Sequence, residues 1–218
     1  MTTPPVSPPQ AGPFQVAVIP RLVPAMGYGL AILGAGLGAM LIRRVLFAMR
    51  EAESAGISAV SRAVAESNLP ILVCLYAAAV IAAASVIIMV ARMLTETSKA
   101  SPSIWFFVVG GALVLLPVAL VWWAESLLIG VFYPGSGGIT AVAEMIFSLT
   151  LVVMIATPIV LFILLGLSVW PITSESKPGW GPLAGSIIVE TLLIAAAIAF
   201  QIRTSWLYRV YEAETLLP

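Results

Sequence analysis

The chain has 218 residues, of which 61% are hydrophobic and only 9% are charged, and its mean hydropathy is +1.11. A soluble domain carries about 25% charged residues, so this chain cannot cover itself with a polar surface. Ten basic residues balance ten acidic ones, every acid is Glu, and the chain contains no His. The composition gives no indication of nucleic-acid binding, and it excludes most metal, haem and catalytic sites that depend on Asp or His.

Five long apolar runs follow one another along the chain, and each is close to the roughly 20 residues that a membrane-spanning helix needs. The runs are 22–42, 69–91, 104–124 (or on to 132), 145–170 and 185–202. A membrane barrel would instead show short segments of alternating hydrophobicity. The sequence therefore predicts an all-α integral membrane protein with a bundle of about five transmembrane helices, which together form one domain over residues 22–203.

The two ends of the chain differ from this apolar domain. Residues 1–21 are rich in Pro and have no basic residue before Arg21, unlike a cleaved signal peptide, and we expect a disordered or extended tail. Residues 204–218 combine aromatic and basic side chains, which is typical of an anchor at the level of the lipid headgroups. We expect a multi-pass protein of the cell membrane, in a bacterial inner membrane.

Two short stretches of sequence resemble each other. GISAVSRAVAES begins at Gly56, and GITAVAEMIFS begins at Gly138. The shift that places Gly56 on Gly138 also places the first apolar run on the third and the second on the fourth. The chain can therefore be interpreted as two repeated hairpins plus one helix, with chance similarity between apolar segments as the alternative.

The same shift places Arg43 against Glu125, and Arg62 against Glu144. In two related hairpins, such residues lie at matched depths with opposite charge. Because a charge near the hydrocarbon is costly unless it is paired, the alignment suggests an ion pair between Arg43 and Glu125. The alternative for Arg43, which ends the first run, is that its side chain simply extends to the interface.

The first hairpin carries a family resemblance. Gly34, Gly36 and Gly38 lie on the first helix and allow a neighbouring backbone to approach closely. A polar segment follows, then Ala63-Val64-Ala65-Glu66-Ser67-Asn68-Leu69, and then a second apolar helix. This arrangement resembles the transmembrane hairpin of the MotA/TolQ/ExbB proton-channel family, in which the corresponding pattern is similar to G-I-A-E-A-L. The resemblance implies an oligomeric subunit of an ion-driven assembly.

The hairpin also departs from that family. The family's two channel helices carry Thr side chains that face the pore, whereas GAGLGAM and PILVCLYA here contain none. The family's large cytoplasmic helical domain has no counterpart either. A rotary-ATPase proteolipid is a weaker resemblance, because its ion-carrying carboxylate in the middle of an even-numbered helix is absent from the second and fourth runs.

Glu190 is the strongest candidate for an intramembrane acid. Within the predicted last span it lies about one and a half turns from the start, at 1.5 Å per residue. One interpretation is a proton or ion site, or a partner for an Arg of another subunit. The other is a Glu near the headgroups that stabilises the positive end of its helix.

Two further acids each have a structural interpretation. If the third helix ends at Trp122–Trp123, Glu125 lies at the interface; if that helix continues, Glu125 is buried and needs a partner. Glu144 begins the fourth helix, where a negative side chain offsets the helix dipole.

No nucleophile–base pair, phosphate loop or metal cluster is recognisable in the sequence, so we expect a non-enzymatic protein without a cofactor. The expected partners are the lipid bilayer and other membrane subunits, either identical copies or a larger complex, and not nucleic acid. Two functions remain open. One is an ion-conducting subunit similar to MotA/TolQ/ExbB, and the other is an accessory subunit of a respiratory, photosynthetic or other membrane complex without ion conduction of its own.

Overall fold

The structure is a computed structural model that describes residues 13–51, 57–95, 103–131, 139–169 and 180–215. Within these ranges the chain forms five long helices. They are α1 (Pro13–Glu51), α2 (Ile57–Thr95), α3 (Ile104–Val131), α4 (Ile139–Val169) and α5 (Trp180–Thr215). The prediction of an all-α bundle is confirmed.

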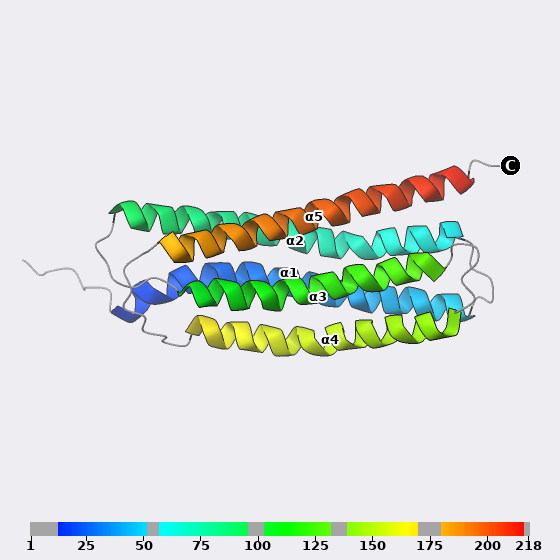
Figure 1. The fold of residues 1–218 in the computed structure, drawn as a ribbon, viewed down its shortest axis with the longest axis horizontal. Helices are drawn as coiled ribbons and strands as arrows, with labels where there is room; N and C mark the ends of the chain where they lie inside the picture. The colour runs from blue at the N-terminus through cyan, green and yellow to red at the C-terminus, as the bar shows by residue number, and fades with distance from the viewer. Residues whose placement is uncertain (1–12, 52–56, 96–102, 132–138, 170–179, 216–218) are drawn as a thin grey trace, which may run out of the picture.

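The helices lie side by side along one long axis (Figure 1). Helices α1, α3 and α5 begin at one end of the bundle, and α2 and α4 begin at the other (Figure 1). Helix α1 packs against α2, α3 and α4, while α5 packs against α2 and α3. Residues from α2, α3 and α5 can therefore meet although they are far apart in the sequence.

The outer surface of the bundle is apolar. Large side chains on several helices point outward, among them Val80, Leu94 and Phe162. All five helices are long and apolar enough to cross a membrane. Lipid chains can cover such a surface, whereas water cannot do so favourably. The chain is a multi-pass membrane protein.

Several helices extend beyond the predicted spans. α1 begins at Pro13, inside the segment predicted to be a tail, α2 begins at Ile57 rather than at residue 69, and α5 continues to Thr215 through the predicted interfacial segment. Hydropathy marks where hydrocarbon surrounds a helix, and a helix can continue into water at both ends. Residues 1–12 and 216–218 of the two predicted end segments lie outside the described residues.

The two similar stretches occupy equivalent positions in the fold. The first described residues of α2 and α4 are Ile57 and Ile139, which the shift of Gly56 onto Gly138 places on each other. Each stretch therefore forms the first turns of a helix that begins at the same end of the bundle (Figure 1). The preceding Gly56 and Gly138 themselves lie outside the described residues.

The glycines of α1 face two different neighbours. A Cβ atom at Gly34 would lie 2.6 Å from Cys74 Cβ on α2, and one at Gly38 would meet Ile71 of the same helix. A Cβ atom at Gly36 would lie 2.7 Å from Thr157 Oγ1 on α4. The three small residues therefore bring α1 close to α2 on one side and to α4 on the other.

Candidate functional site

Glu125 lies at the centre of a buried polar site between α2, α3 and α5. Its side chain is 0% exposed to solvent. Helix α3 continues past Trp122 and Trp123 to Val131, so Glu125 lies within the helix rather than after its end. Of the two interpretations of this residue, the structure therefore supports the one in which Glu125 is buried and requires a partner.

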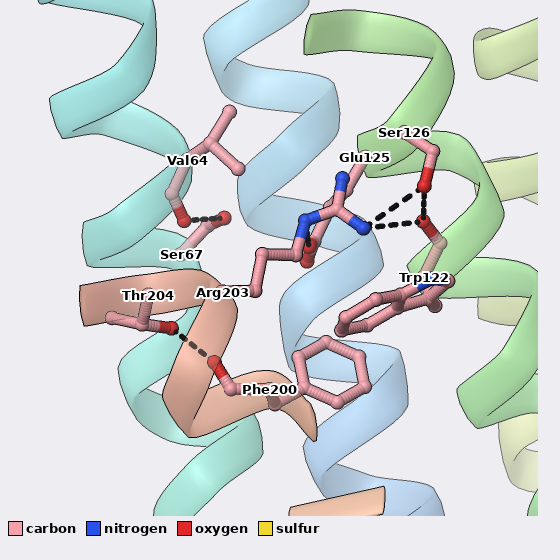
Figure 2. A network of polar contacts seen from close by, with 8 residues as sticks. All are labelled: Val64, Ser67, Trp122, Glu125, Ser126, Phe200, Arg203 and Thr204. Carbon is pink, nitrogen blue, oxygen red and sulfur yellow. Dashed lines mark hydrogen bonds and ion pairs between the residues drawn. The ribbon is translucent and has the colours of Figure 1, made fainter. Parts of the chain in front are cut away.

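Arg203 of α5 is that partner. Its Nε lies 3.4 Å from Glu125 Oε2, and its side chain is only 10% exposed. Through Nη1, the guanidinium also donates to Ser126 Oγ at 2.9 Å and to the Trp122 carbonyl at 3.3 Å (Figure 2). The ion pair and these hydrogen bonds connect α5 to α3 at several atoms, as a planar guanidinium is suited to do.

An aromatic ring lies against the guanidinium. The central carbon of the Arg203 guanidinium lies 4.4 Å from the centroid of the Trp122 ring, which is a cation–π geometry. Trp122 in turn meets Phe200 edge to face, with 5.0 Å between the ring centroids (Figure 2). Phe200 thus supports the ring that lies over the guanidinium.

Asn68 of α2 completes the site. It is fully buried, and its amide is assigned so that the nitrogen faces the carboxylate and donates to both oxygens of Glu125, with a distance of 3.2 Å to Oε2. This orientation also places the amide oxygen 3.2 Å from Thr204 Oγ1. In the reverse orientation, the amide oxygen would instead face the two carboxylate oxygens of Glu125, which cannot donate a hydrogen bond. The site therefore joins three helices that are distant in sequence.

The charged and polar groups of the site compensate one another for the loss of water on burial. A buried charge is expensive unless it is paired and hydrogen-bonded, and Glu125 has both kinds of partner. Removing one member of such a pair leaves an uncompensated charge, which typically costs about 3–5 kcal/mol. Chemically, the arrangement is suited to holding helices in register.

The suggested pair between Arg43 and Glu125 is not formed; among the described residues, the ion-pair partner of Glu125 is Arg203. The guanidinium of Arg43 instead lies over the ring of Phe147 on α4, 3.8 Å from its centroid, and 5.9 Å from that of Phe47. The alignment of the two hairpins compares positions in sequence, whereas the pairing depends on the direction of the side chains: α1 also packs against α3, but Arg43 points to α4. Helix α5 has no counterpart in that alignment.

Arg62 and Glu144 lie apart from the site. Arg62 pairs with Glu66 at 2.9 Å and donates to the Tyr211 hydroxyl at 3.2 Å, in an exposed position that connects α2 to α5. Glu144 is exposed and is the sixth residue of α4, beyond the first turn in which a helix dipole acts most strongly. Neither residue contacts Glu125, and the two do not pair with each other.

Glu190 occupies a different environment on α5. Its Cα is about 15 Å along the helix from the first residue, Trp180. The dipole effect is confined to the first turn, so it does not account for this residue. The side chain is half-buried, and no hydrogen bond or ion pair to another described residue is formed. Glu190 and Glu125 are thus separate features of the bundle.

Hydroxyl groups at depth bond mainly to their own helices. Thr150 donates to Ile146, Thr157 to Val153 and Thr191 to Ile187, each to the carbonyl four residues back at 2.8 Å. Such bonds satisfy a hydroxyl in an apolar environment without a partner on another helix. These groups therefore do not extend the Glu125 site across the bundle.

Sequence reasoning missed Arg203 and Asn68 as members of the site. The sequence pattern places Arg203 at the last position of the transmembrane domain, next to the headgroup anchor, and Asn68 in the resemblance to the proton-channel hairpin. One available signal is depth along the helices. Since α3 and α5 begin at the same end of the bundle, Glu125 and Arg203 both lie about 32–35 Å from the first residues of their helices.

Among the described residues, no group of three or more His, Cys, Asp or Glu could hold a metal ion. No family model, curated protein or solved structure matches the chain.

Proposed function

We propose that this chain is a non-catalytic accessory subunit of a larger membrane assembly and does not conduct ions itself. The observation that carries the proposal is the closure of the Glu125 site. The carboxylate is fully buried, and its oxygens are occupied by Arg203 and Asn68 of the same chain. An ion-carrying carboxylate has to exchange its ion with a pathway, and these partners leave this one committed to the bundle.

The surroundings of the site support the same function. Arg203 is held by Ser126, by the Trp122 carbonyl and by the Trp122 ring, so that a change in its position would break several contacts together. The buried hydroxyls of Ser67 and Thr204 at the site donate to carbonyls of their own helices (Figure 2). A rigid bundle with an apolar outer surface is suited to pack against other membrane helices.

Ion conduction is the second candidate, and the observation that favours it is Glu190. A half-buried carboxylate without an intramolecular partner, well inside a membrane helix, is a plausible proton carrier. In that case the chain would resemble MotA/TolQ/ExbB in function as an oligomer of identical copies. The role of the site at Glu125 would then be structural in each copy.

Proton flux separates the two candidates. The purified chain is reconstituted into vesicles that contain a pH-sensitive dye, and a potassium gradient with valinomycin drives proton entry. As an accessory subunit, the chain is expected to give no flux above that of empty vesicles. A flux that Glu190→Gln abolishes, while the exposed control Glu144→Gln retains it, would contradict the proposal and support conduction.

A further inference from the structure

Glu190 lies well inside the apolar part of α5. The apolar run from Leu183 to Ile202 spans about 30 Å, close to the thickness of the hydrocarbon. Along the helix, Glu190 is about 10 Å from the first of these positions and about 18 Å from the last. Its backbone therefore lies within this apolar run and not at either end of it.

The Glu190 carboxyl differs from the Glu125 carboxyl and from the deep Thr hydroxyls. Glu125 has Arg203 and Asn68, and the deep Thr hydroxyls have backbone carbonyls. Glu190 has neither an ion pair nor a hydrogen bond among the described residues. An ionisable side chain at this depth normally pairs or faces a cavity, so the bundle alone leaves its chemistry incomplete.

Glu190 lies at the border between the packed and the outward faces of α5. On one side of it, Val189 and Leu193 are buried. On the other, Ile187 and Ile194, three residues before and four residues after, are 45% and 40% exposed. We call Ile187, Glu190 and Ile194 the Glu190 edge. A helix packed along this edge would reach the carboxyl group while covering apolar surface.

A second copy offers no unengaged basic residue of α5 or α1 at the level of Glu190. Arg203 is the nearest basic residue along α5, about 20 Å away. On α1, Arg21 lies about 12 Å from the first residue, close to the 15 Å of Glu190 along α5, but Arg21 already has an interaction partner within the chain. A second copy inserted in the same orientation would therefore present either an Arg that is already engaged or one that lies far from this level.

We propose that the Glu190 edge binds a transmembrane helix of a different protein, which brings an Arg or Lys side chain to the level of Glu190. The inference rests on the proposed accessory function and specifies the chemistry of the partner. Charge complementarity selects a basic side chain, because it removes the cost of an isolated charge for both helices. The exposed isoleucines supply the apolar contact around the pair.

Site-specific photocrosslinking in native membranes tests the inference. A photoreactive amino acid replaces Ile194 on the edge, and in a matched control it replaces Phe162 on the outward face of α4. We expect one discrete adduct with a different protein from position 194, with a basic residue in the crosslinked helix. Glu190→Gln is expected to lower its yield at least about tenfold, while Glu144→Gln leaves it unchanged.

A charge exchange then identifies the contact. Glu190→Lys is expected to abolish the adduct, and replacement of the partner's basic residue by Glu is expected to restore it. Unchanged elution and thermal unfolding of the purified variants show that the bundle itself is intact. An adduct that is insensitive to Glu190→Gln, or no adduct from position 194, would overturn the inference.

The two proposals fail in distinguishable ways. If position 162 alone gives an adduct with a different protein, the accessory function stands, and the Glu190 edge is not its contact. If position 194 crosslinks only to a second copy of this chain, the inference is wrong. If, in addition, the purified chain conducts protons through Glu190, the accessory function is wrong as well.

Discussion

Replacement of Arg203 by Met is the sharpest perturbation of the buried site. Met preserves much of the side-chain volume and removes the charge. The variant loses the ion pair at 3.4 Å, the hydrogen bonds to Ser126 and to the Trp122 carbonyl, and the cation–π contact. More importantly, it leaves Glu125 buried without its cation. Breaking a buried pair in this way costs about 3–5 kcal/mol.

A double-mutant cycle isolates the part of this loss that comes from the unpaired charge. Glu125→Gln removes the remaining charge but keeps an acceptor for the Asn68 amide. We therefore expect the double variant Glu125→Gln/Arg203→Met to be more stable than Arg203→Met alone, because neither charge remains. The free energy of unfolding is measured by titration with sodium dodecyl sulfate in mixed micelles, followed by far-ultraviolet circular dichroism.

Arg62→Met is the matched control. Its pair with Glu66 has side chains that are 55% and 53% exposed, so solvent screens the interaction and either partner can be hydrated alone. We expect a much smaller change than for Arg203→Met. The reasoning is refuted if Arg203→Met costs less than about 1 kcal/mol, the range of surface pairs, or if the double variant is no more stable than the single one.

Two further substitutions test the packing around the site and between the helices. Asn68→Leu leaves Glu125 short of a hydrogen-bond donor and is expected to destabilise the bundle by about 1–3 kcal/mol in the same assay; an unchanged midpoint would contradict this role. Gly36→Ala places a methyl group 2.7 Å from Thr157 Oγ1 and is expected to cost about 1–3 kcal/mol. Gly130→Ala, with nothing within 4 Å, is its control and should cost far less; equal losses would show that α1 and α4 do not pack as described.

The number and kind of the helices follow from the sequence because hydrocarbon imposes a simple requirement. A span has to be apolar over about 20 residues and helical throughout, and five runs satisfy this requirement. The apolar runs do not predict where the helices end, because a helix can continue into water. Helix α5 continues through Trp206 and Tyr208 to Thr215, where the composition is that of an interface and the backbone is still helical.

The sequence alone does not predict the buried site, because the site depends on how the helices pack in three dimensions. The sequence identifies Glu125 as needing a partner if its helix continues, but it does not show which way the side chains point. Helices α1 and α5 both pack against α3, and Glu125 meets Arg203 of α5, whereas Arg43 of α1 lies over Phe147 of α4. The role of Asn68 is still harder to predict, since an Asn near the start of an apolar run is usually an interfacial residue.

The accessory function is tested most directly by the mass and composition of the native assembly. Membranes are extracted in mild detergent, and the complex that contains this chain is weighed by native mass spectrometry, with its subunits then released and weighed individually. We expect a single copy of the chain together with other membrane subunits. A ring composed only of identical copies of this chain would contradict the proposal and favour an ion-conducting oligomer.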